Sequence, residues 1–324
     1  MPKGKGIYII AEIGFNHEAD MGSALSMIKA AAGAGADAVK FQTFRAGDIA
    51  LPDSPHYQGI KDMELGLEQH RELSRAAALA GVDFLSTPFS VWAVDLLEEV
   101  GVKAYKAASM DLTNRVLLER IARTGKPLLL STGMAGLSEI AEALDFVKNK
   151  GASEVTLLHC ISKYPAEAGQ LNLEAISLLK ETFGVPVGYS DHYPGNKACL
   201  AAVMLGATVV ETHFTLDRTK EGGDHHHSND PESLKELVRD IRLFRKMRGR
   251  KRFFSNRPDR AEADIFRRGV FAARDIEPGS VLGLQDVLLC RPQSGLTTND
   301  LERILGRKTR KAIAKHQAVS WDDV

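Results

Sequence analysis

Two lysines and two histidines stand where their side chains can do chemistry. Lys40 and Lys106 lie inside short apolar runs, AVKF and AYKA, where an ammonium group is costly unless it has a partner. His192 and His213 end two successive runs of the same kind, GYSDH and VVETH. Two lysine and two histidine side chains together suit a site that holds an anionic ligand beside a divalent metal ion.

The two lysines have short hydroxyl side chains at the ends of neighbouring runs. Two cations among hydroxyl donors favour a phosphate dianion, or a ligand that carries both a phosphate and a carboxylate. The alternative is that both lysines are interior side chains paired with Glu12 or Glu211. The hydroxyl residues are Thr87, Ser109, Ser131 and Ser190.

His192 and His213 would reach one ion if their runs form adjacent parallel strands, which lie about 4.8 Å apart. Two imidazoles that leave positions open for water and substrate suit a Lewis-acid ion such as Mn²⁺. The alternative is a pair of hydrogen-bonded core histidines. Residues 224–227 (DHHH) follow a Glu-Gly-Gly loop. Consecutive side chains point in different directions, so we expect a solvated loop there rather than a metal site.

Eight β-rich apolar runs alternate with amphipathic, helix-like stretches, the count of a TIM (β/α)₈ barrel. Glycine before several runs fits a helix end that adopts a left-handed conformation. An open, doubly wound sheet also alternates in this way. In a barrel, active groups gather at the carboxyl ends of the strands, which would bring the residues above together. The expected strands are 7–13, 36–42, 83–86, 103–106, 127–131, 154–159, 186–189 and 208–213, and expected helices include 23–34, 91–100, 137–150, 171–183 and 231–246.

Composition excludes several classes of protein. The 324 residues carry 42 basic and 42 acidic side chains, so the formal net charge is 42 − 42 = 0 and gives no general attraction to nucleic acid or membrane. No apolar run reaches the roughly 18 residues of a membrane span, and the first residues do not read as a signal peptide. Three widely spaced cysteines favour a reducing compartment, and we expect a cytoplasmic protein.

The pattern changes after the eighth run. Residues 245–260 are rich in Arg and Lys, which favours a solvated helix end and linker over a nucleic-acid patch. Beyond them, short strand-like runs are broken by turns, as in a small β-rich domain. We expect a barrel domain over 1–247, a linker over 248–265 and the small domain over 266–324. The long polar loop 43–66 is typical of a lid or binding loop.

Eight motifs in the barrel region together resemble the sialic acid synthase family, the NeuB-type N-acetylneuraminate synthases. The tail 269–324 is similar to the family's SAF, or antifreeze-like, β-clip domain. The resemblance implies a TIM barrel followed by a SAF domain. It also implies condensation of phosphoenolpyruvate with an N-acetylated sugar aldehyde, such as N-acetylmannosamine, to a nonulosonic acid and phosphate by C–O cleavage. The motifs are AEIGFNHEAD, GADAVKFQTF, FLSTPFS, AYKAASMDLTN, KPLLLSTGM, LLHCISKYP, GVPVGYSDH and ETHFT.

The resemblance implies roles for individual residues. It puts a metal ion, Mn²⁺ or else Mg²⁺ or Co²⁺, on His192 and His213. It implies a domain-swapped homodimer in which Arg291 enters the partner's site. Glu12 or Asp111 would position the attacking water, while Lys106 would stabilise developing charge. Phosphoenolpyruvate would contact Lys40, Gln42, Thr87, Lys106, Ser109, Ser131 and Ser190, and the sugar would contact Glu12, Tyr164 and Asp224.

The sequence departs from the family on the sugar side. Ser162 stands where the best-known synthases have Asn, although we keep it among the substrate-binding residues. Asp111 replaces a Glu, Tyr193 follows SDH, and GGDHHHS replaces a GPDH-like loop. A legionaminic, pseudaminic or spore-coat sugar is therefore an alternative to N-acetylmannosamine. A metal-dependent keto-acid aldolase and a non-catalytic saccharide-binding protein are the competing functions.

Overall fold

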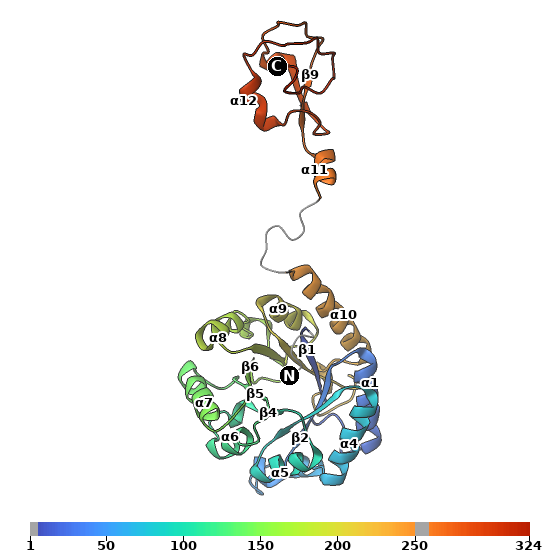
Figure 1. Cartoon of the computed structure of the whole chain (residues 1–324). Helices are drawn as coiled ribbons and strands as arrows, with labels where there is room; N and C mark the ends of the chain where they lie inside the picture. Colours follow the sequence, from blue (N-terminus) through green and yellow to red (C-terminus); the bar gives the residue numbers. More distant parts are fainter. Residues whose placement is uncertain (1–5, 250–258) are drawn as a thin grey trace. The chain divides into compact units, whose positions relative to one another are not determined.

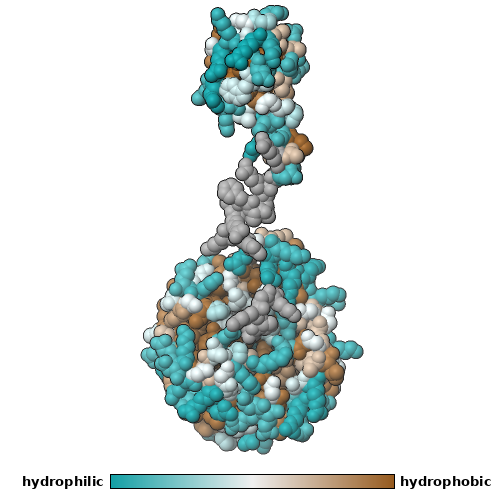
Figure 2. Space-filling model, in the orientation of Figure 1, coloured by the Kyte–Doolittle hydropathy of each residue, from teal (hydrophilic) through white to brown (hydrophobic). Residues whose placement is uncertain are grey.

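The computed structural model describes residues 6–249 and 259–324. The chain divides into two compact units, Met1–Gly249 and Arg250–Val324, and each is described by itself. Within the described residues, no helix combines the length and the apolar character that a bilayer crossing requires. Figure 2 shows hydrophilic side chains over the visible face of both units, with hydrophobic ones scattered among them.

The first unit is a closed barrel of eight parallel strands that neighbour one another in chain order (Figure 1). The barrel closes where β1 pairs with β8, with Glu12 opposite His213. All eight predicted strands are present, and the open sheet is excluded. The strands are β1 (Tyr8–Glu12), β2 (Ala38–Thr43), β3 (Asp83–Pro88), β4 (Tyr105–Ala107), β5 (Leu128–Ser131), β6 (Val155–His159), β7 (Val187–Asp191) and β8 (Val209–His213).

Helices surround the strands, as Figure 1 shows. Several end as predicted at a glycine with positive φ, for example Gly35 after α1. Asp230 caps α10 by accepting the amide of Ser233, and the helix runs two residues beyond the predicted end at 246. The helices are α1 (Met21–Ala34), α4 (Leu67–Ala80), α5 (Val91–Val100), α6 (Arg115–Ala122), α7 (Leu137–Asn149), α8 (Ala175–Phe183), α9 (Lys197–Leu205) and α10 (Pro231–Arg248).

The strand period of two sorts the barrel's side chains into layers. One parity, such as Ile9 and Ala11 of β1, packs against the helices in the large apolar core. The other parity forms a small separate cluster that includes Ile10 and Leu129. Two residues further along most of the strands, the same parity becomes polar, as in Glu12 after Ile10 and Ser131 after Leu129. The barrel interior is thus apolar at one level and polar at the next, toward the carboxyl ends of the strands.

The loop over residues 43–66 has secondary structure of its own, and its role as a lid or binding loop stays a prediction. It contains two short helices, α2 (Ala46–Ile49) and α3 (Tyr57–Asp62). The amide of Ala46 donates to a carboxylate oxygen of Glu64 at 2.7 Å, which joins the two ends of the loop. The sequence signal was missed because each helix is only about one turn long.

The second unit has its own apolar core, which includes Val270, Ile304 and Val319. Its strands β9 (Gly269–Ala272) and β10 (Val287–Cys290) pair antiparallel, and isolated bridges such as Ile276 with Ile313 extend the pairing. Half of the predicted linker, residues 250–258, lies outside the described residues. The part described is largely helical, within α11 (Arg260–Phe266), and α12 (Leu301–Ile304) follows later.

Candidate active site

A cavity of about 340 Å³ opens at the carboxyl ends of the barrel strands. Every strand contributes to it, either directly or through the loop that follows. Its size lies at the lower end of the range for small-molecule sites, roughly 300–1,000 Å³. The predicted site residues that line it are Glu12, Lys40, Gln42, Thr87, Lys106, Ser109, Ser131, Ser162, Tyr164, Ser190, His192, His213 and Asp224.

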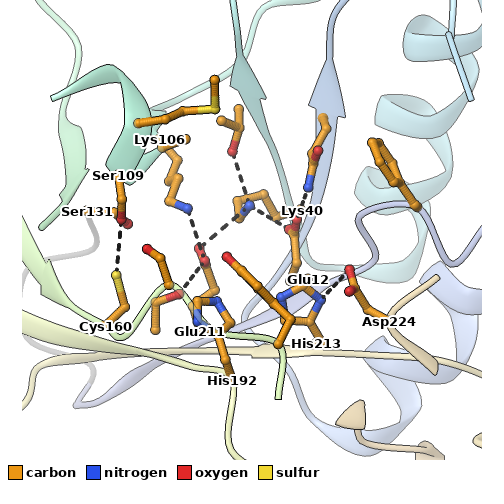
Figure 3. Close-up of a pocket in the computed structure, with 18 of the residues that line it drawn as sticks. Glu12, Lys40, Lys106, Ser109, Ser131, Cys160, His192, Glu211, His213 and Asp224 are labelled. Atoms are coloured by element: carbon orange, nitrogen blue, oxygen red, sulfur yellow. Dashed lines mark hydrogen bonds and ion pairs between the residues drawn. The ribbon is translucent and has the colours of Figure 1, made fainter. Parts of the chain in front are cut away.

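Both interior lysines contact carboxylates in this cavity. The Lys40 ammonium lies 2.6 Å from Glu12 Oε2 and 3.8 Å from Glu211 Oε2, and it donates to the Thr87 hydroxyl at 3.1 Å. The Lys106 ammonium lies 3.4 Å from Glu211 Oε1. Figure 3 shows both lysines turned toward Glu211. The alternative of paired interior lysines is therefore correct, and the same lysines also face the cavity.

Lys106 and Glu211 keep each other charged. Burial opposes the charge on Lys106, but Glu211 and Glu12 raise the pKa of Lys106 above its usual value. Burial likewise opposes ionisation of Glu211, but Lys106 and Lys40 outweigh it and lower the pKa of Glu211. Two ammonium groups and two carboxylates sum to a formal charge of 2 − 2 = 0. A dianionic ligand in this cavity would therefore need positive charge from elsewhere, which a divalent cation could supply.

Two serine hydroxyls differ in how far they are satisfied. Ser109 accepts the amide of Gly133 at 3.1 Å and lies 3.2 Å from the Cys160 thiol. The Ser131 hydroxyl is buried and has no hydrogen-bond partner among the described residues. A buried hydroxyl without a partner is costly, so the cavity offers one donor that only a ligand or water can satisfy.

The two predicted metal-binding histidines come together. The ring centroids of His192 and His213 lie 5.4 Å apart. His192 Nδ1 lies 2.7 Å from the carbonyl oxygen of Ile161, to which it donates a proton, so Nε2 carries the free lone pair. Burial, and then the neighbouring His213, lower the pKa of His192 to about 3. His192 is therefore a neutral imidazole at pH 7, the form that binds metals.

Asp224 and His227 complete this cluster. Asp224 Oδ2 lies 3.2 Å from His213 Nδ1, and Asp224 Oδ1 lies 3.6 Å from His227 Nε2. One ligand atom from each of the three residues lies within 4.8 Å of the others. Burial opposes ionisation of Asp224, but the hydrogen bond and charge of His213 lower its pKa to about 2. Two nitrogens and a carboxylate oxygen held this close can bind a divalent metal ion.

The expectation of a solvated loop over residues 224–227 is wrong. His225 and His227 are 1% and 4% exposed, and only His226 of the three histidines is exposed. The loop forms a 3-10 turn, η3 (His225–His227), with Asp224 at its cap. Residues three apart eclipse in such a turn, so Asp224 and His227 face the same way. His225 turns elsewhere, with its Nδ1 2.7 Å from the Thr215 hydroxyl.

Asn16 fixes the position of this loop. Its side-chain nitrogen donates to the carbonyl oxygen of Phe214 at 3.0 Å and to the Ser228 hydroxyl at 2.9 Å, and its oxygen accepts the amide of Asp224 at 2.9 Å. Asn16 is fully buried. The sequence gives no sign of this role, because the three partners lie about 200 residues away along the chain.

Asp111 does not line the cavity, and Arg291 belongs to the other unit. Asp111 lies in the 3-10 turn η1 (Ser109–Asp111), is buried, and accepts from Asn114 at 3.0 Å. Burial raises its pKa. Arg291 belongs to the second unit, is exposed, and has its guanidinium 5.6 Å from the ring centre of Phe266. The roles of both residues stay predictions.

Comparison with known proteins gives the family. Residues 27–253 match the NeuB family, and residues 267–324 match the SAF domain. The chain is 39% identical to the N,N'-diacetyllegionaminic acid synthase of Campylobacter jejuni, over 97% of this chain and 99% of that protein. It is 36% identical to the enzyme of the same name from Legionella pneumophila, over 100% of this chain and 96% of that protein.

A solved structure agrees. It is an N-acetylneuraminic acid (sialic acid) synthetase from Leptospira borgpetersenii serovar Hardjo-bovis, in complex with citrate. It superimposes with a TM-score of 0.76 at 36% identity, over 81% of this chain and 93% of that one. The resemblance read from the motifs is confirmed, and with it the prediction of an enzyme of the acid-synthase type. The chain belongs to the NeuB family and carries that family's barrel followed by a SAF domain.

Proposed function

We propose that this protein condenses phosphoenolpyruvate with the open-chain aldehyde of an N-acetylated amino-sugar and releases a nonulosonic acid and phosphate. One observation carries the proposal: Lys40, Lys106 and the two histidines His192 and His213 line the same cavity. Glu12 connects the two parts, because it contacts Lys40 directly and pairs in the sheet with His213. Anion binding and carbonyl activation can therefore act on two substrates held side by side.

Phosphoenolpyruvate would occupy the lysine side of the cavity. Lys40 and Lys106 would bind its phosphate and carboxylate, and Ser131 would donate its unpartnered hydroxyl. The remaining polar groups around these lysines would complete the binding site. They are Gln42, Thr87, Ser109, Ser162 and Ser190.

A divalent metal ion fits the other side. Both ring nitrogens of His227 are buried and have no hydrogen-bond partner among the described residues, and His213 Nδ1 is buried beside the Asp224 carboxylate, which suits nitrogens meant for a metal ion. His192 and His213 would hold the ion, and we propose Mn²⁺ as its identity. A bound ion supplies Lewis-acid polarisation of the sugar carbonyl and the positive charge that the lysine–glutamate pairs do not provide.

The protein's own groups would then direct the reaction. C3 of phosphoenolpyruvate bonds to the aldehyde carbon, which leaves an electron-poor centre at C2, and water adds there. Glu12 would orient this water or take its proton, and its position in the cavity lining supports this role, whereas Asp111 does not line the cavity. Cleavage of the C2–O bond releases phosphate, and Lys40 and Lys106 stabilise the charge that gathers on it.

The two relatives named diacetyllegionaminic acid synthases favour a diacetamido-trideoxy sugar as the acceptor over N-acetylmannosamine. The test is a panel assay. The full chain is incubated with phosphoenolpyruvate, Mn²⁺ and each of several N-acetylated hexosamines, diacetamido-trideoxy sugars included, and released phosphate is measured. We expect release with one acceptor class and none after chelation. A condensation product formed without phosphate release would indicate the aldolase instead, and saccharide binding without turnover would indicate a binding protein.

We also propose the domain-swapped homodimer, in which Arg291 of one protomer enters the partner's cavity. This rests on the family resemblance and on the exposure of Arg291 within its own unit. Mixing Arg291→Ala chains with His213→Ala chains tests it. If Arg291 acts on the partner, mixed dimers contain one intact site and regain activity that neither variant has alone. If it acts within its own chain, mixing restores nothing.

A further inference from the structure

We propose that His227 is a third imidazole ligand of the metal site, beside His192 and His213. This inference rests on the proposed function, since the metal ion is the one invoked there. Its basis is the conjunction of a buried, unsatisfied imidazole with a carboxylate and a second imidazole at ligand distance.

The first observation is the state of the His227 side chain. It is 1% exposed, yet neither of its ring nitrogens has a hydrogen-bond partner among the described residues. Three other buried histidines of the barrel each have a partner: His192 has Ile161, His159 has Leu171 and His225 has Thr215. Leaving a buried imidazole unsatisfied costs stability unless a ligand completes it.

The second observation is where this side chain lies. The ring centroids of His227 and His213 are 5.1 Å apart, slightly closer than those of His213 and His192. The ring of Tyr164 packs against all three imidazoles, at 4.1 Å from His192 and 6.0 Å from each of the others. The His213 ring therefore lies beside both of the other imidazoles, and the Tyr164 ring lies near all three.

The third observation is that the Asp224 carboxylate lies between His227 and His213 and approaches both rings. Its two carboxylate oxygens approach one nitrogen of each ring, and the three ligand atoms lie within 4.8 Å of one another. Ligand atoms around a single ion at bond lengths of about 2.0–2.2 Å lie about 3 Å apart when adjacent. Small rotations of side chains are therefore enough to bring the set onto one ion. The turn η3 provides this arrangement, since it places Asp224 and His227 on the same side.

A third imidazole changes which metals the site prefers. Imidazole binds borderline transition ions well, whereas Mg²⁺ prefers oxygen ligands and its own water. With three nitrogens the site should bind Co²⁺ and Mn²⁺ well above Mg²⁺, and His227 should account for much of that difference. If His227 only held Asp224 in position, its replacement would instead weaken the binding of every metal ion to the same extent.

The test uses the full-length protein and measures the metal directly. Electron spin-echo envelope modulation of bound Mn²⁺ detects nitrogen nuclei of coordinated imidazoles, and we expect three in the wild type and two in His227→Ala. Titration calorimetry should show Co²⁺ and Mn²⁺ binding at least about tenfold more weakly in His227→Ala. Mg²⁺ affinity should stay within about twofold. His226→Ala, the exposed neighbour in the same turn, is the matched control and should bind all three ions as the wild type does.

The outcomes separate this inference from the proposed function. Two nitrogens in the wild type, or equal weakening of every ion in His227→Ala, would overturn the third ligand. If His227→Ala does not fold, the wild-type nitrogen count alone decides. Three nitrogens without phosphate release in the sugar panel would uphold the inference and refute the reaction. Release with only two nitrogens would uphold the reaction and refute the inference.

Discussion

Replacing Lys106 with Met should weaken binding of phosphoenolpyruvate without affecting the sugar. The Lys106 ammonium is one of two that face the cavity, and a hydrogen bond to a charged group contributes about 1.5–3 kcal/mol. That range corresponds to a rise of about 10- to 150-fold in the dissociation constant. The remaining groups, Lys40, Glu12 and Glu211, sum to a charge of 1 − 2 = −1, which repels a dianion. We therefore expect a value in the upper half of the range.

The fold should tolerate this change. After the substitution the Glu211 carboxylate still has the Lys40 ammonium at 3.8 Å and still accepts a hydrogen bond from the Ser190 hydroxyl at 2.9 Å. It is therefore not left unpaired. The matched control is Lys103→Met. Lys103 precedes the same strand at its opposite end, is 78% exposed and pairs with Asp83. Its replacement should leave phosphoenolpyruvate binding unchanged.

Calorimetry with phosphoenolpyruvate in the absence of sugar gives the dissociation constant, and steady-state kinetics gives KM for the sugar. The dissociation constant should rise while KM for the sugar stays within about threefold. Equal rises in both, or no rise for phosphoenolpyruvate, would mean that the anion site is elsewhere in the protein.

The remaining predictions concern groups further from the lysines. Asn16→Ala removes the hydrogen bonds that position the loop bearing Asp224, so Mn²⁺ binding measured by calorimetry should weaken several-fold. An unchanged Mn²⁺ affinity would mean that Asn16 is not needed to position this loop. His17 is buried and its Nδ1 accepts the amide of Ala19, while burial, and then His70, lower its pKa from 6.5 to about 4. The unfolded chain therefore binds a proton first as pH falls, and about 3 kcal/mol of stability should be lost between pH 6.5 and 4. Denaturant titrations give the free energy of unfolding at each pH. The difference in this free energy between the wild type and His17→Gln should shrink as the pH falls from 6.5 to 4, and a difference that stays constant would contradict the prediction.

The barrel and most of the cavity follow from the sequence because of the strand period of two. Lys40 and Lys106 stand in apolar runs at positions that face inward, and the carboxyl ends of parallel strands share one rim. Once eight such runs are recognised, the residues at their ends must meet. The pairing of both lysines with Glu211 was visible as an alternative for the same reason.

His227 and Asn16 could not be placed in this way. The position of His227 depends on a single 3-10 turn, which puts it beside Asp224 while its neighbour His226 faces solvent. A run of three histidines carries no periodicity from which that turn can be read. Asn16 acts through Phe214, Ser228 and Asp224, and pairing over about 200 residues has no local signal.

The central claim is that the metal ion and phosphoenolpyruvate occupy one cavity. The most direct measurement is phosphorus-31 relaxation of phosphoenolpyruvate bound to the full-length protein loaded with Mn²⁺. A shared cavity predicts strong shortening of the relaxation times, which His213→Ala abolishes and the His226→Ala control retains. Bound phosphoenolpyruvate whose phosphorus relaxes equally with and without Mn²⁺ would place the two ligands apart and contradict the account.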